Sequence, residues 1–131
     1  MTTKRELEAR YRYFTELQEL GLTYEECETL RRASMTLQSW GEMECNNDVY
    51  REGEGGAVWI REQTYNGITK PRRIPDRETP AIKRCEALCR AHGLIFFHQG
   101  DPRGVAVYVG RQEALGGLPV EEGYNRLVAV F

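Results

Sequence analysis

The spacing of apolar residues changes at about residue 46, and this change restricts the fold more than any other feature of the chain. Before it, apolar residues recur three or four positions apart, as on one face of a helix. After it, short runs rich in Val, Ile and aromatic residues alternate with turn residues, as in antiparallel strands. The pattern predicts one α+β domain over 1–131, with a helical hairpin at 1–46 and a sheet at 57–131 that includes a helix at 76–92. A length of 131 residues fits a single domain.

The first 46 residues contain two helical patterns. The first pattern places one apolar stripe at Leu7, Tyr11, Phe14 and Leu17. Gly21 ends this helix, and Thr23 with Glu26 forms a capping box that starts the next one. The buried face of the second helix is predicted at Leu30, Ala33, Leu37 and Trp40. Because the connection is short, we expect the two helices to form an antiparallel pair.

The remainder of the chain is predicted to form hairpins. Residues 46–56 are expected to be a mobile polar loop, followed by strands at 57–65 and 68–74 that meet at Asn66-Gly67. Pro71 marks the second of these strands as an edge strand, and either Asp76 or Thr79 caps the helix at 76–92. Strands at 94–99 and 105–109 flank a loop at 100–104, and 124–131 adds a possible last strand. The predicted order is ααββαββ(β), with a mainly antiparallel sheet of four to five strands.

Charge is unevenly distributed along the chain. The formal net charge is −2, but residues 1–60 hold 7 basic and 12 acidic groups, and residues 61–90 hold 8 basic and 4 acidic groups. The basic segment offers Arg72, Arg73, Arg77 and Lys83 as a candidate partner-binding patch. Trp59 and Tyr65 lie nearby as stacking surfaces for unpaired bases. The alternative interpretation of these basic residues is a solvated face without a binding role, whose arginines pair with Asp76 and Glu78.

The cysteines are predicted to be reduced and to pack in the core. No apolar stretch follows the N-terminal charges, so export is not expected and the cytoplasm is the expected compartment. Cys85, Cys89 and His92 share one helical face, which fits a core-facing stripe. The alternative is a metal site, but the other two cysteines stand without a close partner, so no metal or cofactor is assigned.

Two further groups of residues are candidates for function. His98, Asp101 and Arg103 surround a predicted turn, where they would suit acid–base chemistry or simply form the turn and the rim of the core. Trp40 and Glu44 share a helix face, which Asn47 joins if the helix continues. Trp40 is interpreted as an anchor on the sheet, and a polar pocket formed with Glu44 and Asn47 is the alternative. No catalytic motif accompanies either group, so no catalytic residue is assigned.

Three segments resemble small phage and prophage proteins of uncharacterised function. They are Leu30-Arg31-Arg32 with 35–45, Pro75-Asp76-Arg77-Glu78, and His98–Gly104, within a similarity that covers roughly residues 30–109. The resemblance implies an accessory protein that binds and blocks a host component, such as a CRISPR or other defence complex.

The leading hypothesis is therefore a non-enzymatic binding protein whose partner is a host protein or nucleoprotein. The first alternative is a nucleic-acid-binding factor that uses the basic segment 70–84. The second alternative is a small enzyme or ligand-binding module around His98, Asp101, Arg103 and Glu44. No membrane partner is expected, because no apolar run is long enough to span a bilayer. An exposed strand edge or the apolar run 127–131 would be able to pair with a second copy of the chain, so an oligomer is a further alternative.

Overall fold

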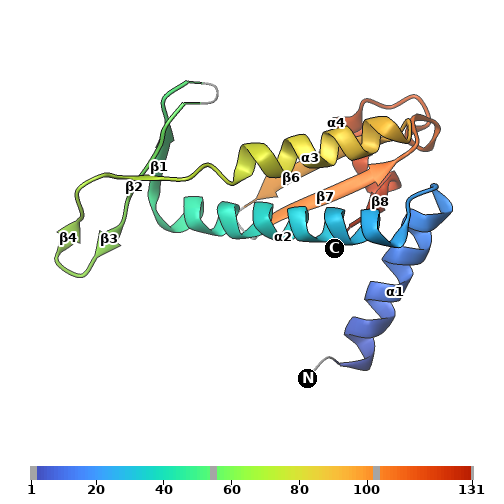
Figure 1. Cartoon of the computed structure of the whole chain (residues 1–131), viewed down its shortest axis with the longest axis horizontal. Helices are drawn as coiled ribbons and strands as arrows, with labels where there is room; N and C mark the ends of the chain where they lie inside the picture. The colour runs from blue at the N-terminus through green and yellow to red at the C-terminus, as the bar shows by residue number, and fades with distance from the viewer. Residues whose placement is uncertain (1–2, 54–55, 102–103, 131) are drawn as a thin grey trace.

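The computed structural model describes residues 3–53, 56–101 and 104–130 (Figure 1). Its helices are α1 (Lys4–Glu19), α2 (Tyr24–Asn46), α3 (Glu78–Ala91) and α4 (Val120–Gly123), with 3₁₀ turns at Gln112–Leu115 and Tyr124–Arg126. Its strands are β1 (Asp48–Arg51), β2 (Val58–Arg61), β3 (Gln63–Thr64), β4 (Gly67–Ile68), β5 (Arg72–Ile74), β6 (Ile95–Asp101), β7 (Gly104–Gly110) and β8 (Val128–Ala129). The α+β class is confirmed.

The strands form two separate three-stranded sheets, not the single sheet of four to five strands that was predicted. One sheet has the order β1-β2-β5 and the other the order β6-β7-β8, and every pairing within them is antiparallel. The short pair β3–β4 continues the β2–β5 ribbon outward. The β6–β7 hairpin lies along α2 and α3, whereas the β1-β2-β5 sheet stands at the far end of these helices (Figure 1).

Strand β1 falls in the segment that was predicted to be a loop, so that prediction is wrong. Its residues pair with β2 from Asp48 opposite Arg61 to Arg51 opposite Val58. The hairpin after β2 is present, but its two loop residues are Tyr65 and Asn66, and Gly67 opens β4 with a φ of +121°. Only the glycine has a left-handed backbone, so the turn shifts by one residue. Strand β5 lies at a sheet edge, as Pro71 predicted.

The strands of the β6–β7 hairpin are longer than predicted. They extend to Asp101 and resume at Gly104, so the predicted loop at 100–104 is shorter. Arg103 lies outside the described residues, as does the side chain of Asp101. The predicted last strand at 124–131 is reduced to Val128–Ala129, because a 3₁₀ turn occupies Tyr124–Arg126.

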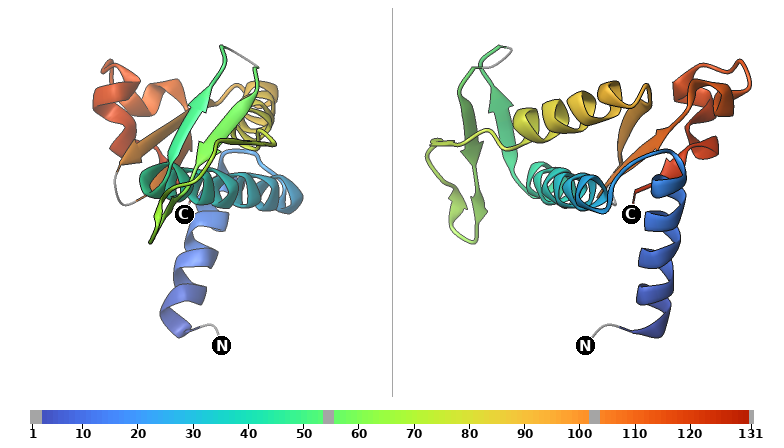
Figure 2. Two further views of the ribbon diagram at one scale, coloured as in Figure 1. Left: turned by 90° about the vertical axis from the view of Figure 1, so that its left-hand side faces the viewer. Right: turned by 45° about the vertical axis from the view of Figure 1, so that its right-hand side comes forward.

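Helix α1 does not fold back along α2, so the predicted antiparallel helix pair is wrong. It leaves the start of α2 at a steep angle and projects from the body of the molecule (Figures 1 and 2). Gly21 has a φ of +102°, a conformation that glycine tolerates and that turns the chain sharply between the helices. Only the C-terminal half of the stripe is covered, where Leu17 is fully buried, while Leu7 and Tyr11 are 40% and 68% exposed.

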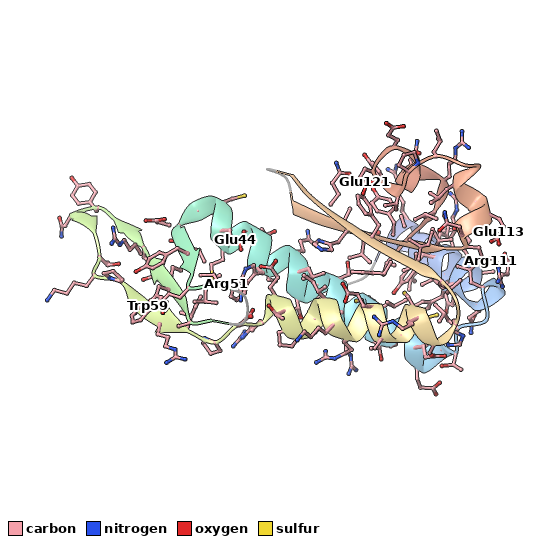
Figure 3. All side chains as sticks on the ribbon, turned by 90° about the horizontal axis from the view of Figure 1, so that it is seen from above. Glu44, Arg51, Trp59, Arg111, Glu113 and Glu121 are labelled. Carbon is pink, nitrogen blue, oxygen red and sulfur yellow. The ribbon has the colours of Figure 1, made fainter. Side chains whose placement is uncertain are left out.

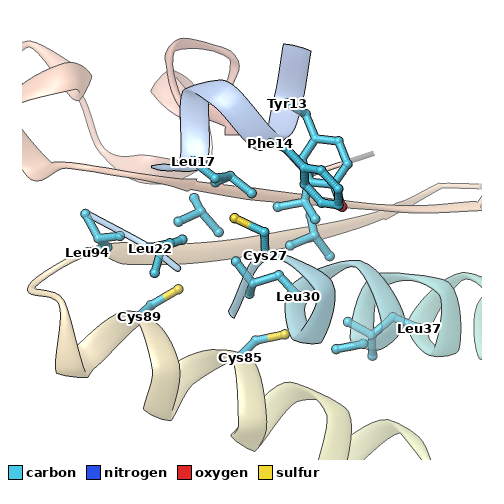
Figure 4. Packing of buried hydrophobic residues seen from close by; sticks show 14 of the residues in the cluster. Tyr13, Phe14, Leu17, Leu22, Cys27, Leu30, Leu37, Cys85, Cys89 and Leu94 are labelled. Atoms are coloured by element: carbon cyan, nitrogen blue, oxygen red, sulfur yellow. The ribbon is translucent and has the colours of Figure 1, made fainter. Parts of the chain in front are cut away.

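The main core lies between α2, α3 and the inner face of the β6-β7-β8 sheet (Figure 4). The predicted buried face of α2 is confirmed, since Leu30, Ala33, Leu37 and Trp40 are all buried. Helix α3 contributes Ala81, Cys85 and Cys89 to this core, and β7 contributes Val107 and Val109. The β1-β2-β5 sheet buries Val58 and Ile60 separately from this cluster.

The capping box of α2 is confirmed and also joins two helices. Thr23 N donates to Glu26 Oε1 at 3.0 Å, and Glu26 N donates to Thr23 Oγ1 at 3.2 Å. The other carboxylate oxygen of Glu26 lies 2.7 Å from His92 Nε2, at the end of α3. The hydrogen bond from the Thr23 backbone, and then the bond to His92, lower the pKa of Glu26.

Core packing of the cysteines is confirmed for three of the four thiols. Cys27, Cys85 and Cys89 are at most 1% exposed, and Cys45 is exposed. Burial raises the pKa of Cys85 to about 11 and that of Cys89 to about 12, so both thiols are protonated at neutral pH. His92 is hydrogen-bonded to Glu26 and is not directed to a shared site with these thiols. Within the described ranges, no group of three or more His, Cys, Asp or Glu side chains is arranged to hold a metal.

We expect one thiol of the native protein to react rapidly with a disulfide reagent such as DTNB. Cys45 is accessible, whereas each buried thiol must wait for an opening of the core and should react at least about 1,000-fold more slowly. The measurement is thionitrobenzoate release before and after addition of guanidinium chloride. In Cys45→Ser protein, the rapid phase should disappear. A rapid phase of more than one thiol per chain would contradict the buried positions of Cys85 and Cys89.

Candidate functional site: the groove between α2 and β5

A groove of about 620 Å³ separates the outer side of α2 from β5 and the segment that leads into α3. We call it the α2–β5 groove. Its lining residues on α2 are spaced three or four apart and form one stripe of the helix. They are Arg32, Met35, Thr36, Ser39, Trp40 and Met43, and the opposite wall consists of Arg72, Ile74, Pro75 and Arg77.

We call the apolar part of the lining, to which both walls contribute, the floor of the groove. It includes Met35, Met43, Ile74 and Pro75, and Met35 is 44% exposed. Methionine side chains are flexible and polarisable, so such a floor adapts to apolar groups of different shapes. Trp40 is 6% exposed and closes the floor between the helix and the sheet. This position fits the predicted anchoring role of Trp40.

Trp40 is fixed in place by Glu44. Trp40 Nε1 donates to Glu44 Oε1 at 2.5 Å, one helical turn along α2. The predicted sharing of a face by these two residues is thus confirmed. Asn47 Nδ2 instead donates to the backbone oxygen of Met43 at 3.0 Å, at the end of the helix. Asn47 therefore serves to terminate α2, and it does not line the α2–β5 groove.

Three guanidinium groups stand around the apolar floor. Arg72 Nη2 pairs with Glu62 Oε1 at 2.7 Å, and both side chains are largely exposed. The guanidinium groups of Arg32 and Arg77 are exposed and make no hydrogen bond or ion pair with another described residue. Among the described residues, no carboxylate lines the groove, although Glu62 pairs with Arg72. The lining therefore combines apolar side chains with Arg72 and with the positive charges of Arg32 and Arg77.

An ion-pair cluster fixes the end of the groove where α3 begins. Arg51 Nη1 lies 2.5 Å from Asp76 Oδ2, and Arg51 Nη2 lies 3.8 Å from a carboxylate oxygen of Glu78. Asp76 Oδ1 also accepts from the backbone N–H groups of Glu78 and Thr79, each at 3.1 Å. The N-cap position of α3 is occupied by Arg77, not by Asp76 or Thr79 as predicted, but the Asp76 side chain supplies the capping hydrogen bonds and joins β1 to this helix. Figure 3 shows Arg51 and Glu44 at the same end of the molecule as Trp59.

The cluster shifts the pKa values of its Asp76 and Glu78 carboxyl groups in opposite directions. The Arg51 guanidinium holds the pKa of the Asp76 carboxyl well below its usual range. Burial raises the pKa of the Glu78 carboxyl, and the neighbouring Glu44 carboxylate raises it further. Asp76 is consequently ionised at neutral pH and forms an ion pair with Arg51. The sequence suggested Asp76 and Glu78 as partners for nearby arginines, but the arginine that holds both is Arg51, which sequence reasoning missed.

The other predicted residues lie apart from the groove. Arg73 is on the opposite face of β5 from Arg72, and Lys83 is exposed on α3. His98 is partly buried, with its ring 5.7 Å from that of Phe96 on the core-facing side of β6. This placement fits the predicted alternative in which His98 lies at the rim of the core. Glu44 is held by Trp40, so among the described residues His98 and Glu44 share no polar contact.

Sequence reasoning identified Trp40, Arg72 and Arg77 but missed Arg32, Met35 and Met43. A signal for the missed residues was present, since they recur at helical spacing on the side of α2 opposite its core face.

Comparisons with protein-family models, curated proteins and solved structures found no match for this chain. None of the helices in the described ranges combines the length and apolar character needed to cross a bilayer. The function is accordingly inferred from the geometry and charge of the groove.

Proposed function

We propose that this chain is a non-enzymatic binding protein whose α2–β5 groove receives a segment of a partner protein. The observation that carries the proposal is the combination of three arginines with an apolar floor in a groove of about 620 Å³. The segment that fits this surface carries carboxylates for the rim and at least one large apolar side chain for the floor. Arginine pairs strongly with carboxylates, because its fork of N–H groups matches their two oxygens.

A protein segment suits the groove better than a nucleic acid does. Methionine-lined grooves on helices are typical of sites that take an amphipathic helix or an extended peptide. The arginines of the basic segment also divide between the two faces of β5, so they do not form one continuous phosphate-binding track. These features favour the predicted protein or nucleoprotein partner over nucleic acid alone at this groove.

The resemblance to phage and prophage proteins supports the accessory role, because two of its segments supply groove residues. On this proposal, the partner is a component of a host defence complex, and its acidic segment occupies the groove. Binding there would block whatever that segment contacts in the free host component.

The test is a selection of random 16-residue peptides displayed against the immobilised protein. We expect the enriched peptides to combine Asp or Glu with Leu, Met, Phe or Trp. A selected peptide should bind the double variant Arg32→Glu/Arg77→Glu at least about 30-fold more weakly, because two charge-assisted contacts become repulsive.

The matched control is Lys83→Glu/Arg84→Glu, which makes the same change in net charge on exposed positions of α3 outside the groove. It should alter the affinity less than about 2-fold at 0.15 M salt. Enrichment of basic or uncharged peptides would refute the proposal, as would equal losses in the two double variants.

A further inference from the structure

The β1-β2-β5 sheet has a second face, which is turned away from its buried side. Strand alternation places Val58 and Ile60, each 2% exposed, on the buried side, so Trp59 between them points the other way. Tyr50 on β1 and Arg73 on β5 are the direct neighbours of Trp59 across the sheet. In a view onto the end of the molecule that carries this sheet, the sheet lies in front of α2 and α3 (Figure 2, left).

We call Tyr50, Trp59, Arg61 and Arg73 the outer sheet face. Tyr50 is 39% exposed, and the guanidinium carbon of Arg61 lies 5.9 Å from the centre of its ring. Trp59 is half-buried, and its ring nitrogen is buried without an acceptor among the described residues. The part of this side chain that reaches solvent is therefore carbon surface. Two aromatic side chains thus lie side by side on adjacent strands, with an arginine next to each.

The charge of this face is positive. Arg73 is exposed and makes no ion pair with a described residue, and the guanidinium group of Arg61 lies over the Tyr50 ring. The single acidic side chain in these rows of the ladder is Asp48, opposite Arg61. Lys70 is exposed in the connection that leads to β5 and adds a further positive charge to this end of the molecule.

We propose that the outer sheet face binds single-stranded nucleic acid, with bases stacked on Trp59 and Tyr50 and phosphates neutralised by Arg73 and Arg61. Proteins that bind single-stranded nucleic acid stack bases on exposed aromatic side chains of a sheet and neutralise the backbone with nearby basic residues. A duplex does not offer unpaired bases for such stacking. This surface is separate from the α2–β5 groove, so a nucleoprotein partner would engage both.

The test is fluorescence anisotropy with 5′-fluorescein-labelled dT20 in 50 mM salt. We expect a dissociation constant of about 1–100 µM and a slope of log affinity against log salt of about −1 to −2, because one or two phosphates are neutralised. Arg73→Glu should weaken binding at least about 10-fold, and Trp59→Leu about 5- to 100-fold through loss of stacking. Arg84→Glu, on an exposed position of α3, should change the affinity less than about 2-fold. A U20 probe distinguishes RNA from DNA as the preferred strand.

Stacking itself is measured through tryptophan emission. The chain contains two tryptophans, so Trp40→Phe leaves Trp59 as the sole emitter. Its fluorescence should be quenched by unlabelled dT20 and not by a 20-base-pair duplex. Absence of dT20 binding in 50 mM salt, binding without quenching, or equal affinity for the duplex would each overturn the proposal. The variant Arg32→Glu/Arg77→Glu should retain dT20 affinity within about 3-fold, which separates this result from failure of the groove proposal.

Discussion

Replacing Leu17 with alanine is expected to lower the free energy of unfolding by about 3 kcal/mol, because it removes a fully buried side chain and leaves a cavity. Leu17 belongs to the main core cluster, together with Tyr13 and Phe14 of the same helix. Its loss should weaken the attachment of the whole helix. Urea denaturation followed by circular dichroism measures the change, and protease sensitivity of α1 reports its release.

Leu7→Ala is the matched control on the same helix. Leu7 belongs to the same apolar stripe in the sequence but is 40% exposed in the structure. The substitution should therefore cost less than about 1 kcal/mol. Similar losses for the two variants would mean that α1 packs along its full length, contrary to its projection in Figures 1 and 2.

Replacing Asp76 with alanine is expected to cost about 2–3 kcal/mol at pH 7. The change removes the cap of α3 and the close partner of Arg51, whose side chain is 27% exposed. The melting temperature should fall by roughly 6–10 °C for a chain of this size. Differential scanning calorimetry measures this shift. Asp48→Ala, at an exposed position of β1 without such contacts, should lower stability by less than about 0.5 kcal/mol.

The Asp76 contribution should also depend on pH in a defined direction. The pKa of Asp76 is lowered in the folded protein, so its stabilising effect is present above the unfolded pKa of about 4. The effect is lost as pH falls through the lower folded pKa. The stability difference between wild type and Asp76→Ala should therefore shrink from pH 5 to pH 2. A difference that stayed constant over this range would rule out the ionised pair with Arg51.

The features that sequence predicted correctly depend on residues close together in the chain. The capping box joins Thr23 to Glu26, and the buried face of α2 follows from helical spacing alone. The direction of α1 depends instead on the backbone at Gly21 and on tertiary contacts of Leu17, so the apolar stripe did not reveal it. Strand β1 was missed because its four residues are stabilised by pairing with β2, after an intervening Gly-rich segment.

The candidate site, too, could be predicted only where it depends on residues close together in the chain. Trp40 was identified by its size and position, and Arg72 and Arg77 by local charge. That Arg72 and Arg77 face Met35 and Trp40 across one groove depends on how β5 lies against α2, which no local pattern encodes. Arg51 was missed because its partner Asp76 is 25 residues away.

Helix α2 carries two stripes of side chains, one in the core and one in the α2–β5 groove. Leu30, Ala33 and Leu37 face the interior, while Arg32, Met35 and Met43 line the groove on another side. Substitutions in the second stripe should change the groove with little loss of stability, because the interior stripe is left intact. If the groove binds a partner as proposed, its specificity can therefore change on a constant framework, and Trp40 is the residue that belongs to both stripes.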